Sequence, residues 1–129
     1  MNYQSQKIRA RHYVTAELVD IVIRHGVIQS LDSPGPEPAD VQSGWVAPAL
    51  FDLQINGCDG CSFNSDQLTV DNVRHVVDIC RKHGIGGFCP TLITNSFEAI
   101  THGLSTIRQA CEKDAEIAHV VPALHLEGP

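Results

Sequence analysis

Short β-branched runs dominate the first part of the chain. Between Lys7 and about Leu31 the apolar residues come in groups of two or three, and His25-Gly26 separates the last two groups. Runs of this length, divided by tight-turn residues, are typical of strands joined by hairpins. We predict a β meander with a hairpin turn at His25-Gly26, with strands over Tyr13-Val14, Leu18-Val19, Ile21-Val22-Ile23 and Val27-Ile28.

The segment 32–38 interrupts this pattern. It contains three prolines and a glycine, which remove backbone donors and add conformational freedom, so it cannot continue a strand ladder. We predict a linker or domain boundary there, with residues 1–47 as the strands of a small β domain plus linker and 48–129 as a second domain. About thirty residues of meander cannot enclose a core, so this sheet must pack on another part of the protein.

The second part alternates apolar runs with helical spacing. Thr69 is a suitable N-cap, valines then recur at helical spacing as far as Cys80, and Gly84 suits a C-cap. Strand followed by helix, twice over, with a third strand at the end, predicts a parallel α/β sheet with right-handed connections. The predicted elements are strand 45–57, helix 69–84, strand 87–93, a helix capped by 94–96, and strand 120–124.

Polar side chains gather where these strands end. Glu127 and His125 project to the same side of an extended chain after the third strand, as Gln54 and Asn56 do at the first. A carboxylate that ends an apolar strand either binds a cation or pairs with amides or an arginine, so Glu127 is a candidate metal ligand. The two amides suit hydrogen bonding to a substrate or to a metal ligand; alternatively, they satisfy backbone groups of the loop that follows. His125 is either a ligand or substrate contact, or a structural histidine.

Composition excludes several classes of protein. The chain has 129 residues, 15 acidic against 9 basic side chains and a formal charge of -6, which argues against a nucleic acid partner. It has no apolar stretch of membrane-spanning length and no signal peptide pattern, so we expect a cytoplasmic protein without a membrane partner. Five cysteines are an odd number for a disulfide framework. Cys58 and Cys61 match Cys-x-x-Cys, but without a second pair of ligands a zinc or redox role is weakly indicated.

Three motifs identify a family. The segments 46–57, 90–94 and 125–129 resemble, in order and spacing, those of the N-acetylglucosamine-6-phosphate deacetylase family of the amidohydrolase superfamily. They read VAPALFDLQING, PTLIT and HLEGP. Ala49, where the family usually has glycine, and the cysteines of the following loop depart from the family pattern.

The resemblance implies a fold and a chemistry. The fold is the N-terminal part of a (β/α)8 TIM-type barrel, preceded by strands of a small β-sandwich domain. Glu127 would bind one divalent metal, zinc, with Gln54, Asn56 and His125 as substrate-binding residues or as partners of the metal ligand. The reaction would be hydrolysis of the acetamide of N-acetylglucosamine 6-phosphate by metal-activated water, in an enzyme that is a homodimer at full length.

The same resemblance predicts that the chain is incomplete as an enzyme. The family's metal-binding histidines, catalytic aspartate and phosphate-contacting residues all follow the matched motifs, so no catalytic residue is assigned within these 129 residues. We therefore expect the chain to be inactive alone. The alternatives are another amidohydrolase that acts on a cyclic amide or a dipeptide, and a non-catalytic truncated product.

Overall fold

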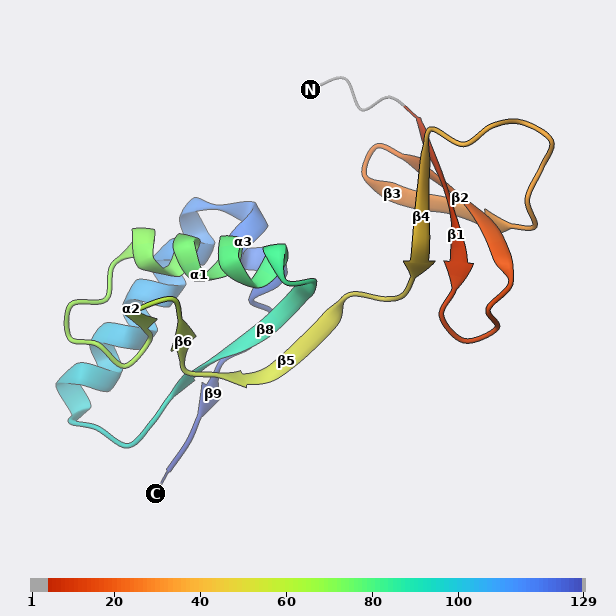
Figure 1. Ribbon diagram of the computed structural model, residues 1–129. Coiled ribbons are helices and arrows are strands. Elements are labelled where there is room, and N and C mark those ends of the chain that lie inside the picture. The colour runs from red at the N-terminus through yellow and green to blue at the C-terminus, as the bar shows by residue number, and fades with distance from the viewer. Residues whose placement is uncertain (1–4, 129) are drawn as a thin grey trace. The chain divides into compact units, whose positions relative to one another are not determined.

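A computed structural model describes residues 5–128, which divide into two compact units between Pro48 and Ala49. The first unit is one four-stranded sheet with the strand order β3-β2-β1-β4 (Figure 1). Antiparallel pairs join β1 to β2 and β2 to β3, whereas β4 pairs with β1 in parallel. The strands are β1 (Gln6–His12), β2 (Leu18–Arg24), β3 (Val27–Asp32) and β4 (Val41–Val46).

The predicted hairpin turn is confirmed. His25 and Gly26 connect β2 to β3 with φ of 53° and 74°, the two positive values of a type I′ turn, whose twist matches that of the flanking strands. The predicted strand at Tyr13-Val14 is wrong, because these residues lie in the connection between β1 and β2. The preceding residues of β1 pair with β2 instead, from Gln6 opposite Ile23 to Arg11 opposite Leu18.

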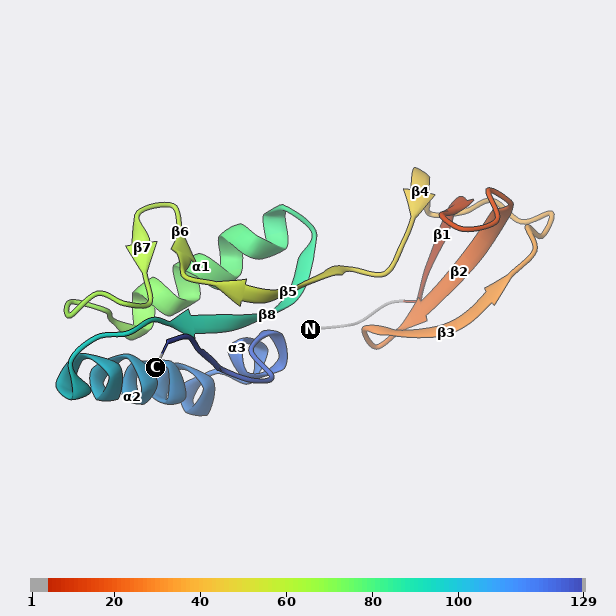
Figure 2. The same ribbon diagram turned by 90° about the horizontal axis from the view of Figure 1, so that it is seen from below.

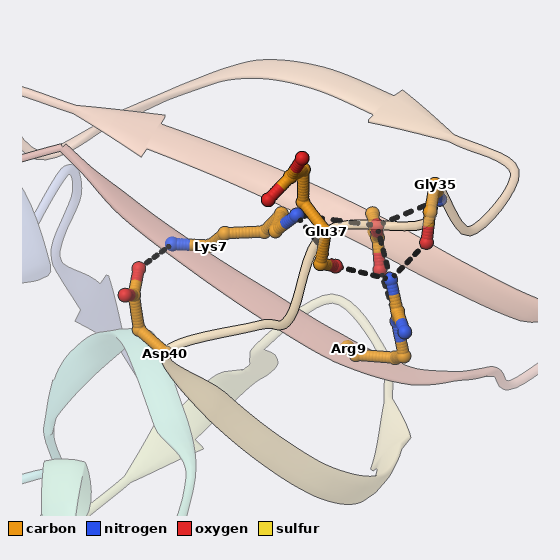
Figure 3. Close-up of polar contacts among 6 residues, drawn as sticks. Lys7, Arg9, Gly35, Glu37 and Asp40 are labelled. Atoms are coloured by element: carbon orange, nitrogen blue, oxygen red, sulfur yellow. Dashed lines mark hydrogen bonds and ion pairs between the residues drawn. The ribbon is translucent and has the colours of Figure 1, made fainter.

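The proline-rich segment 32–38 lies within the first unit, and the division after Pro48 falls one residue beyond the predicted division of 1–47 from 48–129. It is a loop that returns the chain to the sheet, where β4 pairs with β1. Figure 3 shows the polar contacts that fix it: Arg9 donates to the carbonyls of Gly35 and Glu37, at 2.8 and 3.1 Å. Lys7 also donates to the Glu37 carbonyl, and the Lys7 backbone N–H donates to Asp40. Three hydrogen bonds to carbonyls of the proline-rich loop, and a fourth to Asp40 just after it, make this loop part of the unit.

Asp20 is the buried charge beneath this loop. Its two oxygens accept from Arg9 Nε and Nη2 at 2.6 and 2.8 Å, and the Gly35 N–H donates to it at 3.1 Å. The Arg9 hydrogen bonds, which outweigh the opposing effect of burial, lower the pKa of Asp20 to about 2. A bidentate pair of this kind fixes β1, β2 and the loop to one another.

The second unit is built on a parallel sheet in the order β5-β8-β9, as the alternation of strands and helices predicts. Strands β5 and β8 run side by side in Figure 2, and α1, α2 and α3 lie on the same side of them in Figure 1. The strands are β5 (Leu50–Ile55), β6 (Gly57–Cys58), β7 (Cys61–Ser62), β8 (Ile85–Leu92) and β9 (His125–Leu126). The helices are α1 (Val70–Lys82), α2 (Phe97–Lys113) and α3 (Ala115–Val120).

Both ends of α1 follow the sequence prediction. The Thr69 side chain accepts from the Asn72 N–H, and the Asn72 side chain accepts from the Thr69 N–H, which is a capping box. Gly84 has φ of 80° just beyond the C-cap residue His83, as a left-handed helix ending requires. Val73, Val76 and Val77 of α1 are buried in the core, and Val70 is partly buried against it.

Two predicted strands are wrong in extent. The run that begins at Trp45 is not continuous, since β4 ends at Val46 and β5 begins at Leu50. The predicted strand 120–124 is the end of a helix followed by an irregular segment. Asp114 caps α3 through hydrogen bonds to Glu116 and Ile117 N–H groups, and Ile117 and Val120 are the buried residues of that helix. Pairing with β8 begins at His125.

The core of the second unit lies between the helices and β8. It contains Phe63, Leu68, Val73, Val76, Val77, Cys80, Phe88, Leu92, Ile107, Ala110, Ile117, Val120 and Val121. Strand β5 contributes little to it, and Leu50, Phe51 and Leu53 are exposed.

The described residues, 5–128, contain no helix with the length and apolar character of a membrane span.

Candidate functional site

The carboxyl ends of β5, β8 and β9 bring three distant segments together. Thr91 pairs with His125 and Leu92 with Leu126, and the Glu127 N–H then donates to the Leu92 carbonyl at 2.8 Å. The parallel ladder therefore continues as far as Glu127. Because all three strands run in the same direction, their polar ends share one edge of the sheet, where α/β proteins place their sites.

Gln54 and Glu127 form the central contact of this edge. Gln54 Nε2 donates to Glu127 Oε2 at 2.5 Å, between residues that are 73 positions apart in the chain. The Gln54 backbone N–H donates in turn to Asp52 Oδ1 at 3.0 Å. Both residues of the pair are exposed, and among residues 5–128 no hydrogen bond is made to the second carboxylate oxygen of Glu127. A charge-assisted bond to one oxygen orients the carboxylate and leaves the other available to a ligand.

The residue after Glu127 is Gly128, where the structure leaves no room for a side chain. Gly128 has φ of 118°, and a Cβ atom there would lie 1.9 Å from Thr94 Oγ1. The residue after Glu127 therefore packs closely on Thr94, in the segment that follows β8. The backbone before Glu127 is held by the hydrogen bond to the Leu92 carbonyl, and the backbone after it follows a path that only glycine can adopt beside Thr94.

His125 is held more loosely, beside β8. Its Nδ1 lies 3.4 Å from the hydroxyl of Thr91, a fully buried residue whose Oγ1 also donates to the Cys89 carbonyl. The histidine itself is partly buried. The His125 side chain contacts Thr91 and not Glu127, although Glu127 follows His125 by only two positions.

Asn56 lies one residue past the end of β5, with its side chain exposed. Its carbonyl accepts from the Phe63 N–H at 2.9 Å, which closes the loop that follows β5. Of the four residues that the sequence suggests for the site, the structure joins Gln54 to Glu127 by a hydrogen bond. Among residues 5–128, no hydrogen bond links the side chain of Asn56 or His125 to either of these two.

Asn64 is a positioning residue that sequence reasoning missed. Its Nδ2 donates to the Thr91 carbonyl at 3.0 Å and its Oδ1 accepts from the Ile93 N–H at 2.8 Å. One amide side chain thereby pairs with two backbone groups, the Thr91 carbonyl and the Ile93 N–H, at the end of β8. The sequence offers little signal for this role, since Asn64 lies in a polar loop 27 residues before Thr91.

The described residues at this edge do not form a complete metal site. Across residues 5–128, no group of three or more histidine, cysteine, aspartate or glutamate side chains is arranged to hold a metal ion. A catalytic zinc has three protein ligands and an open position. Glu127, an exposed residue with one oxygen oriented by Gln54, fits as one ligand of such a set.

The relatives that match this chain in sequence are deacetylases of amino sugar phosphates. No family model matches the chain. It is 30% identical over 116 residues to the N-acetylglucosamine-6-phosphate deacetylase of Haemophilus influenzae, an alignment that covers 90% of this chain and 28% of that protein. It is 28% identical over 130 residues to the N-acetylgalactosamine-6-phosphate deacetylase of Escherichia coli O157:H7, which covers 95% of this chain and 33% of the relative.

A solved structure of such an enzyme shares the fold of this chain. The crystal structure of N-acetylglucosamine-6-phosphate deacetylase from Pasteurella multocida superposes with a TM-score of 0.77 at 21% identity, over 98% of this chain and 35% of that one. The chain thus spans about a third or less of the length of these proteins. By sequence and by fold, N-acetylglucosamine-6-phosphate deacetylases are its homologues and structural neighbours.

Proposed function

We propose that this chain forms part of a metal-dependent N-acetylglucosamine-6-phosphate deacetylase, which hydrolyses the acetamide to glucosamine 6-phosphate and acetate. The observation that carries the proposal is the hydrogen bond between Gln54 and Glu127. It orients a carboxylate at the carboxyl edge of a parallel sheet, in a chain whose homologues are deacetylases. This is the edge at which barrels and open α/β sheets place their reacting groups.

In this proposal Glu127 is one ligand of a single divalent metal, zinc by the family resemblance. The metal would lower the pKa of water so that it attacks the acetamide carbonyl at neutral pH. Gln54 holds Glu127 Oε2 and keeps the carboxylate facing the site, as a partner of a metal ligand commonly does. Asn56 and His125 flank this pair and are proposed to hydrogen-bond to the amino sugar phosphate.

The exposed apolar residues of β5 support a larger parallel sheet. Leu50, Phe51 and Leu53 are 65%, 52% and 74% exposed on an edge strand, where further strands would cover them. We propose that they become buried in a closed (β/α)8 barrel, with the first unit forming part of a β-sandwich. The enzyme would then act as a cytoplasmic homodimer.

The purified 129-residue chain is predicted to release no acetate from N-acetylglucosamine 6-phosphate, with or without added zinc. The reason is that one carboxylate cannot hold a catalytic metal, and the described residues offer no second and third ligand near it. Acetate release can be followed by a coupled assay. Turnover that a chelator abolishes would show that the chain carries a complete site.

N-acetylgalactosamine 6-phosphate is a second candidate substrate. The relative from Escherichia coli O157:H7 is named for that sugar and aligns with 95% of this chain. The two sugars differ in the configuration of one ring hydroxyl, whereas the acetamide that reacts is the same in both. The proposed chemistry therefore applies to either substrate, and the choice between them depends on contacts to the ring.

A chimera tests the function and the substrate together. In the Haemophilus influenzae deacetylase, the segment that aligns with this chain would be replaced by the chain itself. The chimera should release acetate from N-acetylglucosamine 6-phosphate faster than from the galactosamine isomer. A folded chimera that binds zinc but hydrolyses neither sugar would contradict the proposal, and a preference for the isomer would favour the second candidate.

A further inference from the structure

Cys58 and Cys61 face each other across a tight hairpin that follows β5. Strands β6 and β7 pair in antiparallel fashion, with Cys58 opposite Cys61 and Gly57 opposite Ser62. Asp59 and Gly60 form the turn, with φ of 49° and 79°, the two positive values of a type I′ turn. The Cys-x-x-Cys spacing therefore places its two cysteines at directly opposed positions.

The backbone geometry suits a disulfide. Directly opposed residues of an antiparallel pair have Cα atoms roughly 4.5–5.5 Å apart. Disulfides span Cα separations of about 4.4–6.8 Å. Both cysteines are free and partly exposed, and they line an open hollow with Asn56 and Ser62. A small oxidant can therefore reach two thiols whose backbone positions suit a disulfide.

Neighbouring side chains hold the hairpin in this conformation. His75 Nε2 of α1 lies 2.7 Å from Asp59 Oδ2 at the turn. Asn72 Nδ2 donates to Cys61 Sγ at 3.5 Å, and the same amide is oriented by Thr69, which donates to its Oδ1. Gly57 permits the close approach, since a Cβ atom there would lie 2.0 Å from the Cys61 carbonyl oxygen. The contacts that cap α1 thus also position the sulfur of Cys61.

We propose that Cys58 and Cys61 are a reversible dithiol, which forms an intramolecular disulfide by exchange with a low-molecular-weight disulfide such as oxidised glutathione. In the first step Cys61 attacks one sulfur of the reagent, which breaks its S–S bond and releases one thiol. Cys58 then attacks the Cys61 sulfur and releases the second thiol. Two protein thiols are oxidised, one reagent disulfide is reduced to two thiols, and the two protons pass to the released thiols.

The order of attack follows from the surroundings of each sulfur. Burial raises the pKa of the Cys58 thiol, and Cys61 is the sulfur that receives a hydrogen bond from Asn72. Cys80 lies against Cys58 but is buried in α1, where burial raises its pKa to about 11. Cys61 is therefore the first nucleophile, and Cys80 stays reduced. No set of three metal ligands is formed by these or other residues of the described chain, so a dithiol role fits the pair better than a metal site.

The test is a redox titration of the 129-residue chain in mixtures of reduced and oxidised glutathione, quenched by alkylation and analysed by peptide mass spectrometry. A parallel titration in urea gives the same equilibrium for the unfolded chain. We expect the peptide that holds both cysteines to lose two hydrogens, with an equilibrium constant at least about tenfold larger without urea than with it. An equal or smaller constant without urea would overturn the proposal, because the hairpin would then not favour the bond.

Variants identify the reacting sulfurs. Cys58→Ser should accumulate a stable glutathione adduct on Cys61, whereas Cys61→Ser should react more slowly at Cys58. Cys111→Ser, which removes a partly buried thiol on α2, is the matched control and should leave the titration unchanged. A Cys58–Cys80 bond, an intermolecular dimer, or glutathione adducts on both residues of the unaltered chain would each overturn the proposal.

Discussion

Phe63 is predicted to contribute more to the stability of the second unit than any exposed aromatic residue. It is 1% exposed, its ring centroid lies 6.2 Å from that of Phe88, and its N–H closes the loop onto Asn56. Replacing a buried phenylalanine with alanine costs about 3–5 kcal/mol. A unit of this size has a free energy of unfolding of about 4–12 kcal/mol, so Phe63→Ala should remove about a quarter of it or more.

The assay is urea unfolding followed by the helical circular dichroism signal, since α1, α2 and α3 all lie in the second unit. With a slope of about 1–3 kcal/mol per molar urea, the Phe63→Ala midpoint should fall by about 1 M or more. Phe97→Ala is the matched control, because Phe97 is 80% exposed, and should change the free energy by about 0.5 kcal/mol or less. Equal effects of the two substitutions would refute this account of the core.

Two further predictions concern single contacts. Because the pKa of Asp20 is lowered to about 2 from the usual 3.8, its contribution to stability is complete above about pH 4 and is lost as the pH falls toward 2. Acid titration followed by the fluorescence of Trp45, the single tryptophan, should show this loss, and Asp20→Asn should remove that pH dependence while the exposed Asp32→Asn leaves it. Thr69→Ala, which deletes the N-cap of α1, should destabilise the second unit by about 1 kcal/mol in urea unfolding. Thr101→Ala, on the exposed face of α2, is the control and should leave the stability unchanged. Equal urea midpoints for the two variants would contradict the capping role.

The helices could be predicted because their signals are local. Thr69, the valine spacing and Gly84 lie within one short segment, and each acts on the backbone of its own helix. The turn at His25-Gly26 is local in the same way. The parallel sheet of the second unit also followed from the sequence, since crossover helices of this length join parallel strands.

Long-range contacts explain where the prediction failed. The proline-rich loop belongs to the first unit because Arg9 and Lys7 bind its carbonyls and because β4 returns to β1, and neither contact can be read from the loop itself. The run 120–124 looks like a strand in composition. Asp114 caps a short helix, α3, which ends at Val120. The first residue of the run, Val120, therefore packs into the core from a helix and not from a strand.

The candidate site could also be predicted only where its signals are local in the sequence. The residue types at the strand ends were visible in the sequence, and the assumption of a parallel sheet placed Gln54 and Glu127 on one edge. The hydrogen bond between them depends on a register that is set by the pairing of β8 with both neighbours. Asn64 could not be identified in advance, because its role is defined by the backbone of β8, which is remote in sequence.

The most direct measurement for the central claim is the zinc content of the chimeric deacetylase carrying Glu127→Ala, compared with Glu112→Ala on the exposed face of α2. If Glu127 is a metal ligand, its removal should lower zinc affinity by at least about tenfold and abolish acetate release, while the Glu112 variant keeps both. A folded Glu127→Ala chimera that retains its zinc and its turnover would contradict the account.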